Sequence, residues 1–94
     1  MGINVAGEGS QVVDNFVYHT TAGGAGGWAA GIQNDQAQGI VLGNRVVGVA
    51  GGATNYGVFC NGGGVVRLLR DNSVVDAATP FSFGCTLAGL TNYP

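Results

Sequence analysis

The chain has 94 residues, of which 46% are hydrophobic, 9% are charged and 19 are glycine, with a formal net charge of -2 at pH 7. It is one domain at most by length, too apolar for a disordered tail, and its glycines lack the three-residue period of collagen. With three cationic side chains it does not suit electrostatic binding of nucleic acid. Composition therefore favours a structural or binding role over an enzyme.

The shortage of charge also bears on how the surface is used. Each ordered glycine loses about 0.5–1 kcal/mol of backbone entropy relative to alanine, so a lone domain of this composition is marginally stable. Few charges also make it poorly soluble. We therefore expect other subunits to cover much of its surface.

The first residues predict an extended arm. Ile3 and Val5 alternate with the polar Asn4, which is the pattern of a short strand, and no signal-peptide pattern is present. We expect residues 1–10 to form an extended N-terminal arm that adds a strand to a neighbour's sheet, or else a frayed terminus. Residues 11–94 are expected to form a single β domain.

Strand signals fill the rest of the chain, and no window keeps a helical period without a glycine interrupting it. Residues 20–30 are expected to form a loop. The longest uncharged stretch, residues 46–66, contains seven glycines and predicts strands and turns, not a membrane span. The expected strands are residues 12–18, 40–42, 45–49, 56–60, 65–70, 73–75 and, in extended form, 81–90.

Three short turns separate these strands, at Gly43-Asn44, Asn61-Gly62 and Asp71-Asn72. Asn-Gly and Gly-Asn pairs favour two-residue hairpins, because their residues tolerate positive φ. The sequence therefore predicts an all-β fold: a small glycine-rich β-barrel or two-layer sandwich built from a hairpin meander. We expect no internal sequence repeat. Strand edges that are exposed and lack lysine favour pairing with another chain.

Catalytic and metal sites are not predicted. His19 is the single histidine, so a Ser-His-Asp triad or a zinc site has too few partners. The run from Gly24 to Ala29 fits a dinucleotide fingerprint, but Gly31 interrupts the helix that such a site needs. We expect no enzyme activity, cofactor or metal. Cys60 and Cys85 are expected to be buried free thiols, with a single bridge as the alternative.

Two side chains stand out as candidate binding residues. Trp28, the only tryptophan, is a core filler, an aromatic anchor in a subunit interface, or part of a sugar-stacking platform with Tyr56. Arg70 stands next to Asp71, which favours a local ion pair at the turn. Arg67, between the apolar Val66 and Leu68, is the alternative candidate, crossing a subunit boundary to Asp76 or Asp14. The candidate capsid or subunit interface therefore comprises Ile3, Asn4, Val5, Trp28 and Arg67.

The segment from residue 39 to residue 90 has a recurring layout of short apolar strands and glycine-rich turns. It combines Gly64-Val65-Val66-Arg67, a later turn at Pro80, and the ending Thr86-Leu87-Ala88-Gly89-Leu90. This layout resembles the small glycine- and alanine-rich capsid cement, or head decoration, proteins of tailed bacteriophages.

The resemblance implies a compact β-barrel-like structural virion protein on the capsid surface, often a homotrimer, assembled in the host cytoplasm. Such a subunit binds the major capsid protein, bridges neighbouring capsid subunits and stabilises the shell. Two alternatives stay open: a tail, fibre or collar subunit, or a small secreted carbohydrate- or surface-binding module that uses Trp28 and Tyr56. A secreted module favours a Cys60–Cys85 disulfide, whereas a phage head protein favours free thiols.

Overall fold

The computed structural model of the chain describes residues 2–7, 9–22, 27–34, 39–60, 68–82 and Cys85. None of these residues belongs to a helix long and apolar enough to span a membrane. The described part contains ten β-strands: β1 (Ile3–Val5), β2 (Gln11–Val13), β3 (Phe16–Thr21), β4 (Trp28–Asn34), β5 (Ile40–Leu42), β6 (Arg45–Ala50), β7 (Thr54–Cys60), β8 (Leu68–Arg70), β9 (Ser73–Ala77) and β10 (Thr79–Phe81).

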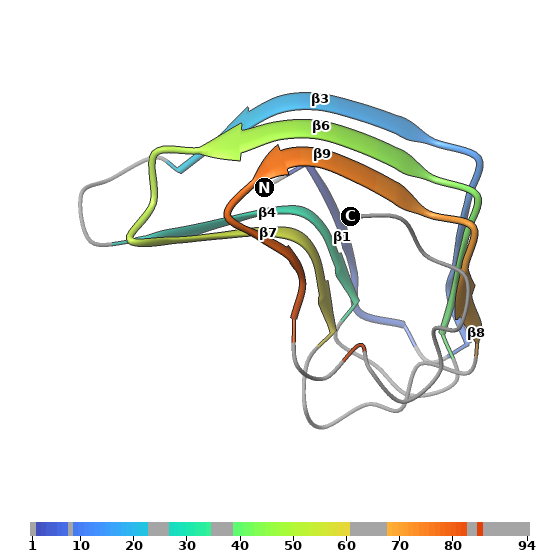
Figure 1. The fold of residues 1–94 in the computed structure, drawn as a ribbon. Helices are drawn as coiled ribbons and strands as arrows, with labels where there is room; N and C mark the ends of the chain where they lie inside the picture. Colours follow the sequence, from blue (N-terminus) through green and yellow to red (C-terminus); the bar gives the residue numbers. More distant parts are fainter. Residues whose placement is uncertain are drawn as a thin grey trace.

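The strands form three parallel sheets that wind as a coil. Their orders are β1-β4-β7-β10, β2-β5-β8 and β3-β6-β9, so each strand pairs in parallel with the strand three places later. The first coil is β1 to β3, the second β4 to β6 and the third β7 to β9, and β10 begins another. Figure 1 shows β3, β6 and β9 stacked side by side, opposite β4 and β7. This is a parallel β-helix.

The prediction of an all-β fold is confirmed, but the predicted hairpin meander is wrong. Among the described strands, none pairs with the strand that follows it in the chain. The sheets form a β-helix instead of the expected barrel or sandwich. Gly43-Asn44 joins β5 to β6 and Asp71-Asn72 joins β8 to β9, strands that belong to different sheets. Residues 61 and 62, expected to form the third hairpin, lie outside the described residues.

The bends between sheets use the backbone conformation that the hairpin prediction also required. Asp14, Gly43 and Asp71 occupy equivalent places and have φ values of 57°, 68° and 57°. A left-handed residue turns the chain sharply, and glycine and aspartate tolerate that conformation better than most residues. The local signal is the same for a hairpin and for a corner of a coil, so it does not decide which strands pair.

The register exposes an internal repeat, contrary to the expectation that there is none. Val12 pairs with Val41, 29 positions later, and Val41 pairs with Leu69, 28 positions later. Val17, Val46 and Val74 form a second column with the same spacing. The repeated sequence is an asparagine followed two positions later by an inward valine. Each coil is one copy of this unit, as expected of a solenoid.

An asparagine ladder closes one corner of the coil. Asn15 Nδ2 donates a hydrogen bond to Asn44 Oδ1 (3.1 Å), and Asn44 Nδ2 donates to Asn72 Oδ1 (3.0 Å). Asn44 Nδ2 also donates to the carbonyl of Val12, and Asn72 Nδ2 donates to the carbonyl of Val41. These buried backbone carbonyls therefore have hydrogen-bond partners, so burying the corner carries no penalty for leaving them unpaired.

The interior is narrow because a column of glycines faces a column of valines. A Cβ added at Gly31 would meet Val46 Cγ1 and lie 2.8 Å from the carbonyl oxygen of Gly57. Gly57 faces Val74 in the same way, and Gly2 faces Val17. Close approach of the two sheets therefore requires glycine here. The buried apolar cluster comprises Val12, Val17, Ala29, Ile32, Val41, Val46, Val49, Val58, Cys60, Leu69, Val74 and Cys85.

Three further expectations are corrected. Ile3 to Val5 form β1, which pairs with β4 of the same chain, so they lie in the protein's own sheet and not in a separate arm. The predicted loop over residues 20–30 ends early, because Trp28 begins β4. Cys60 and Cys85 are not free thiols: they form a disulfide across a sequence separation of 25. The single bridge left open as the alternative is the one present.

Candidate functional site

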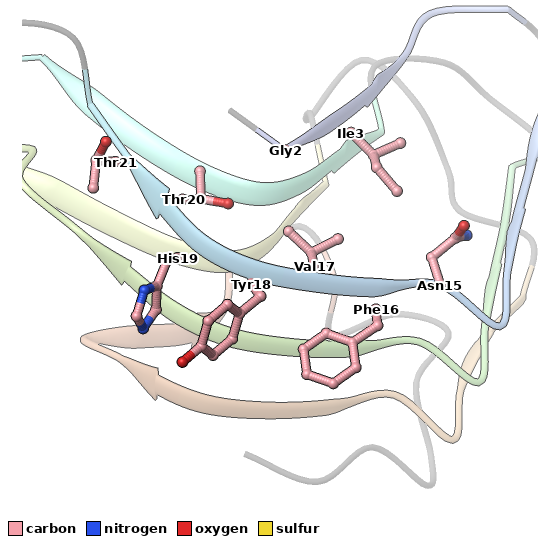
Figure 2. A pocket seen from close by; sticks show the side chains of 9 residues that line it. All are labelled: Gly2, Ile3, Asn15, Phe16, Val17, Tyr18, His19, Thr20 and Thr21. Carbon is pink, nitrogen blue, oxygen red and sulfur yellow. The ribbon is translucent and has the colours of Figure 1, made fainter.

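The open end of the first coil forms a hollow of about 440 Å³, lined by Gly2, Ile3 and residues 15–21. Figure 2 shows Ile3, Val17 and Thr20 directed toward the space between β1 and β3. Phe16, Tyr18 and His19 project from the other side of β3. Within the described residues, β1, β2 and β3 each have one strand neighbour, so their second edges present unpaired backbone groups.

Beside the open edge, the outer surface of β3 carries two exposed aromatic side chains. Phe16 and Tyr18 are 64% and 61% exposed, and their rings meet edge to face with centroids 5.9 Å apart. The positions paired with Phe16 in the next two coils hold Arg45 and Ser73. Large apolar side chains that stay exposed mark interaction surfaces more often than scattered single residues do. The open edge therefore lies beside an apolar patch.

The asparagine ladder also ends at this edge. Asn15 Oδ1 accepts no hydrogen bond from the described residues, although the equivalent oxygen of Asn44 accepts from both the backbone N–H (2.9 Å) and the side chain of Asn15. Among these residues, the ladder of side-chain oxygens along the corner therefore ends at Asn15, whose oxygen is available to accept a hydrogen bond. His19 is exposed and stacks on Tyr18, with ring centroids 3.8 Å apart.

A second hollow lies on the outer face of the sheet that contains β4 and β7. Its volume is about 300 Å³, and it is lined by Trp28, Gln33, Thr54, Tyr56 and Phe59. The Trp28 centroid lies 6.2 Å from that of Tyr56 and 5.1 Å from that of Phe59, and the last two lie 4.9 Å apart. We call these three side chains the aromatic cluster. Because Trp28 is 42% exposed, it is not a core filler.

Sequence reasoning named Trp28 and Tyr56 but missed Phe59. Tyr56 and Phe59 are three residues apart, and strict alternation along a strand would place them on opposite faces. Gly57 and Val58 are both buried, however, and both contact the interior. Two consecutive inward residues reverse the alternation, so Tyr56 and Phe59 share the outer face. No signal in the sequence alone marks that bend.

The candidate interface residues do not gather at one place. Ile3 lines the hollow of the first coil, Asn4 and Val5 follow it in β1, and Trp28 lines the other hollow. Arg67 lies outside the described residues. The ion pair expected between Arg70 and Asp71 is present, with Nε and Oδ2 3.5 Å apart, and both side chains are about half exposed.

In the part of the chain that the structure describes, no three histidine, cysteine or acidic side chains group so as to hold a metal ion. Comparison with protein-family models, with curated proteins and with solved structures finds no match to this chain.

Proposed function

We propose that the protein is a structural, non-enzymatic assembly subunit that attaches to another subunit through the open edge of its first coil. The observation that carries the proposal is the unpaired edge of β1, β2 and β3 beside the exposed Phe16 and Tyr18. A partner strand that pairs with this edge satisfies its backbone groups, which is the β-augmentation mode of recognition. No catalytic step is required of any residue.

Burial of the apolar patch supplies the second part of the binding energy. Removing a large apolar side chain from water contributes about 1.5–3 kcal/mol, and Phe16 and Tyr18 both lie beside the edge that pairs. The backbone pairing fixes the register and the side chains add affinity. Edge strands that lack lysine do not repel such a partner, and the whole chain contains no lysine.

The biological setting that we propose is the surface of a phage-type capsid, as the family resemblance implies. The partner is then the major capsid protein, and the subunits, as trimers, bridge neighbouring shell subunits as cement or decoration. A tail, fibre or collar location uses the same edge. The Cys60–Cys85 disulfide is the outcome that the secreted-module alternative favours. The capsid setting requires that the two thiols are oxidised after release from the reducing cytoplasm.

Particle stoichiometry tests the setting. Particles from the source are pelleted and washed, and this chain is quantified against the most abundant shell protein. A fixed ratio near one copy per shell subunit supports the cement role. A few copies per particle refute that role in favour of a tail or collar location, and absence of the chain from particles overturns the virion setting altogether.

A matched pair of lysine substitutions tests the docking edge. Tyr18→Lys places a charge beside the open edge, and we expect occupancy on stripped particles to fall at least about tenfold. Val75→Lys is the control, because Val75 occupies the equivalent column on the third coil and is also exposed. Equal occupancy of the two variants, with matching thermal melts, refutes docking through the first coil.

A further inference from the structure

The aromatic cluster on β4 and β7 has no part in the docking edge. Its hollow and that of the first coil have no lining residue in common. The interior of the coil is already filled by small and branched side chains such as Ala29, Ile32 and Val58. Trp28, Tyr56 and Phe59 therefore form an additional apolar surface outside the core, with one tryptophan partly open to solvent.

The cluster is held rigidly by regular structure. Trp28 and Thr54 are register partners in adjacent parallel strands, as are Gln33 and Phe59. The turn that leads into β7 is fixed by two hydrogen bonds between Gly52 and the Asn55 side chain, of 2.9 and 3.1 Å. Sites built on strands keep their geometry better than sites built on loops. The free-energy cost of ordering the protein on binding is therefore small at this site.

The chemistry of the lining selects a class of ligand. Aromatic rings form the apolar part of the lining, Thr54 and Tyr56 contribute hydroxyl groups, and the buried Gln33 contributes an amide. None of the five lining residues is charged, which disfavours phosphates and carboxylates as ligands. A pyranose ring has matching character, with a C–H face that stacks on an aromatic ring and hydroxyls around its edge. The volume of about 300 Å³ is at the lower end of ligand sites.

We propose that this hollow binds a neutral carbohydrate, with one sugar ring stacked on Trp28 and its hydroxyls hydrogen-bonded by Thr54 and Tyr56. The site stands apart from the docking edge, so the protein holds its partner through the first coil and a glycan through the second and third coils. Failure of one proposal leaves the other intact.

Tryptophan fluorescence gives a direct readout, because Trp28 is the only tryptophan. The full chain is titrated with neutral oligosaccharides (β-1,4-linked glucose, mannose and xylose series) and with an oligogalacturonate as the charged counterpart. We expect at least one neutral series to shift the emission saturably and the oligogalacturonate to leave it unchanged. No saturable response to any neutral series, or stronger binding of the charged one, overturns the proposal.

Variants assign the binding to the cluster, with calorimetry as the measurement. Trp28→Ala is expected to weaken binding at least about tenfold, and Trp28→Phe to restore most of it, because a ring face remains. Thr54→Val removes one hydroxyl at the rim, and a loss of about threefold to tenfold is expected. Tyr18→Ala is the control, since it removes an exposed aromatic ring outside the site. Unchanged affinity in Trp28→Ala, or equal loss in Tyr18→Ala, refutes the assignment.

Discussion

The first and second coils are copies of one unit in different surroundings. Asn44 is 1% exposed and lies between two ladder partners, whereas Asn15 has a partner on one side and is only half-buried. The second coil carries Arg45 on its outer surface at the position where the first coil carries Phe16. A repeat unit covered on both sides thus serves as core, and the same unit open on one side leaves an unpaired edge, which we propose as the docking surface.

The largest expected effect comes from filling the glycine column. In Gly31→Ala the new methyl group meets Val46 and the backbone of Gly57 inside the second coil, where neither can withdraw. We expect unfolding to become easier by about 3–4 kcal/mol, or folding to fail. Urea unfolding measures this.

The equivalent substitution in the first coil is Gly2→Ala. In Gly2→Ala the methyl group meets Val17 and lies 2.6 Å from the carbonyl oxygen of Gly31. The segment before β1 lies at the edge of its sheet and can shift outward, so the expected loss is about 1 kcal/mol. Equal losses in the two variants would mean that the first coil is as confined as the second.

The disulfide fixes the third coil, and no such bond fixes the first among the described residues. Replacing Cys60 and Cys85 by serine releases a loop with a sequence separation of 25. Chain-entropy arguments give a loss of about 3 kcal/mol. Urea unfolding with and without a reducing agent measures it. A variant as stable as the oxidised wild type would contradict a stabilising role for the bridge.

The last comparison is between the middle of the ladder, Asn44, and its open end, Asn15. Asn44→Ala leaves the Val12 carbonyl and the Asn15 backbone N–H without their side-chain partners, and a loss of about 2–3 kcal/mol is expected. Asn15→Ala removes a half-exposed end of the ladder, and about 1 kcal/mol is expected. Thermal melts of the two variants, compared side by side, test the ranking. A larger loss of stability in Asn15→Ala than in Asn44→Ala would contradict this ranking and show that Asn15 contributes more to the stability of the corner.

Sequence reasoning located several strands closely and misjudged how they pair. Residues 40–42 were expected as a strand and form β5, and residues 45–49 fall within β6. The bend between them was also expected, with positive φ at Gly43. A bend of this chemistry fits a hairpin and a coil corner equally, so the pairing had to come from the register. The repeated Asn-x-Val at residues 15–17, 44–46 and 72–74 was the signal that distinguishes them.

The candidate sites were likewise predicted only in part from the sequence. Trp28 and Tyr56 were foreseen as a pair of rings, because both are aromatic residues among small ones. Phe59 joins them only through the bend at Gly57 and Val58. The open edge of β3 exists because, among the described strands, β3 pairs with β6 alone. Both depend on which strands lie side by side.

Three features follow from the amino-acid sequence alone: the β class, the positions of the bends and the low charge of the surface. These follow from side-chain shape, backbone freedom at glycine and aspartate, and solvation, all of which act within a few residues. Parallel pairing across 28 or 29 positions, the closed asparagine corner and the placing of the aromatic cluster were decided by the tertiary structure. They depend on burial and hydrogen bonds between residues far apart in the chain, which local sequence does not encode.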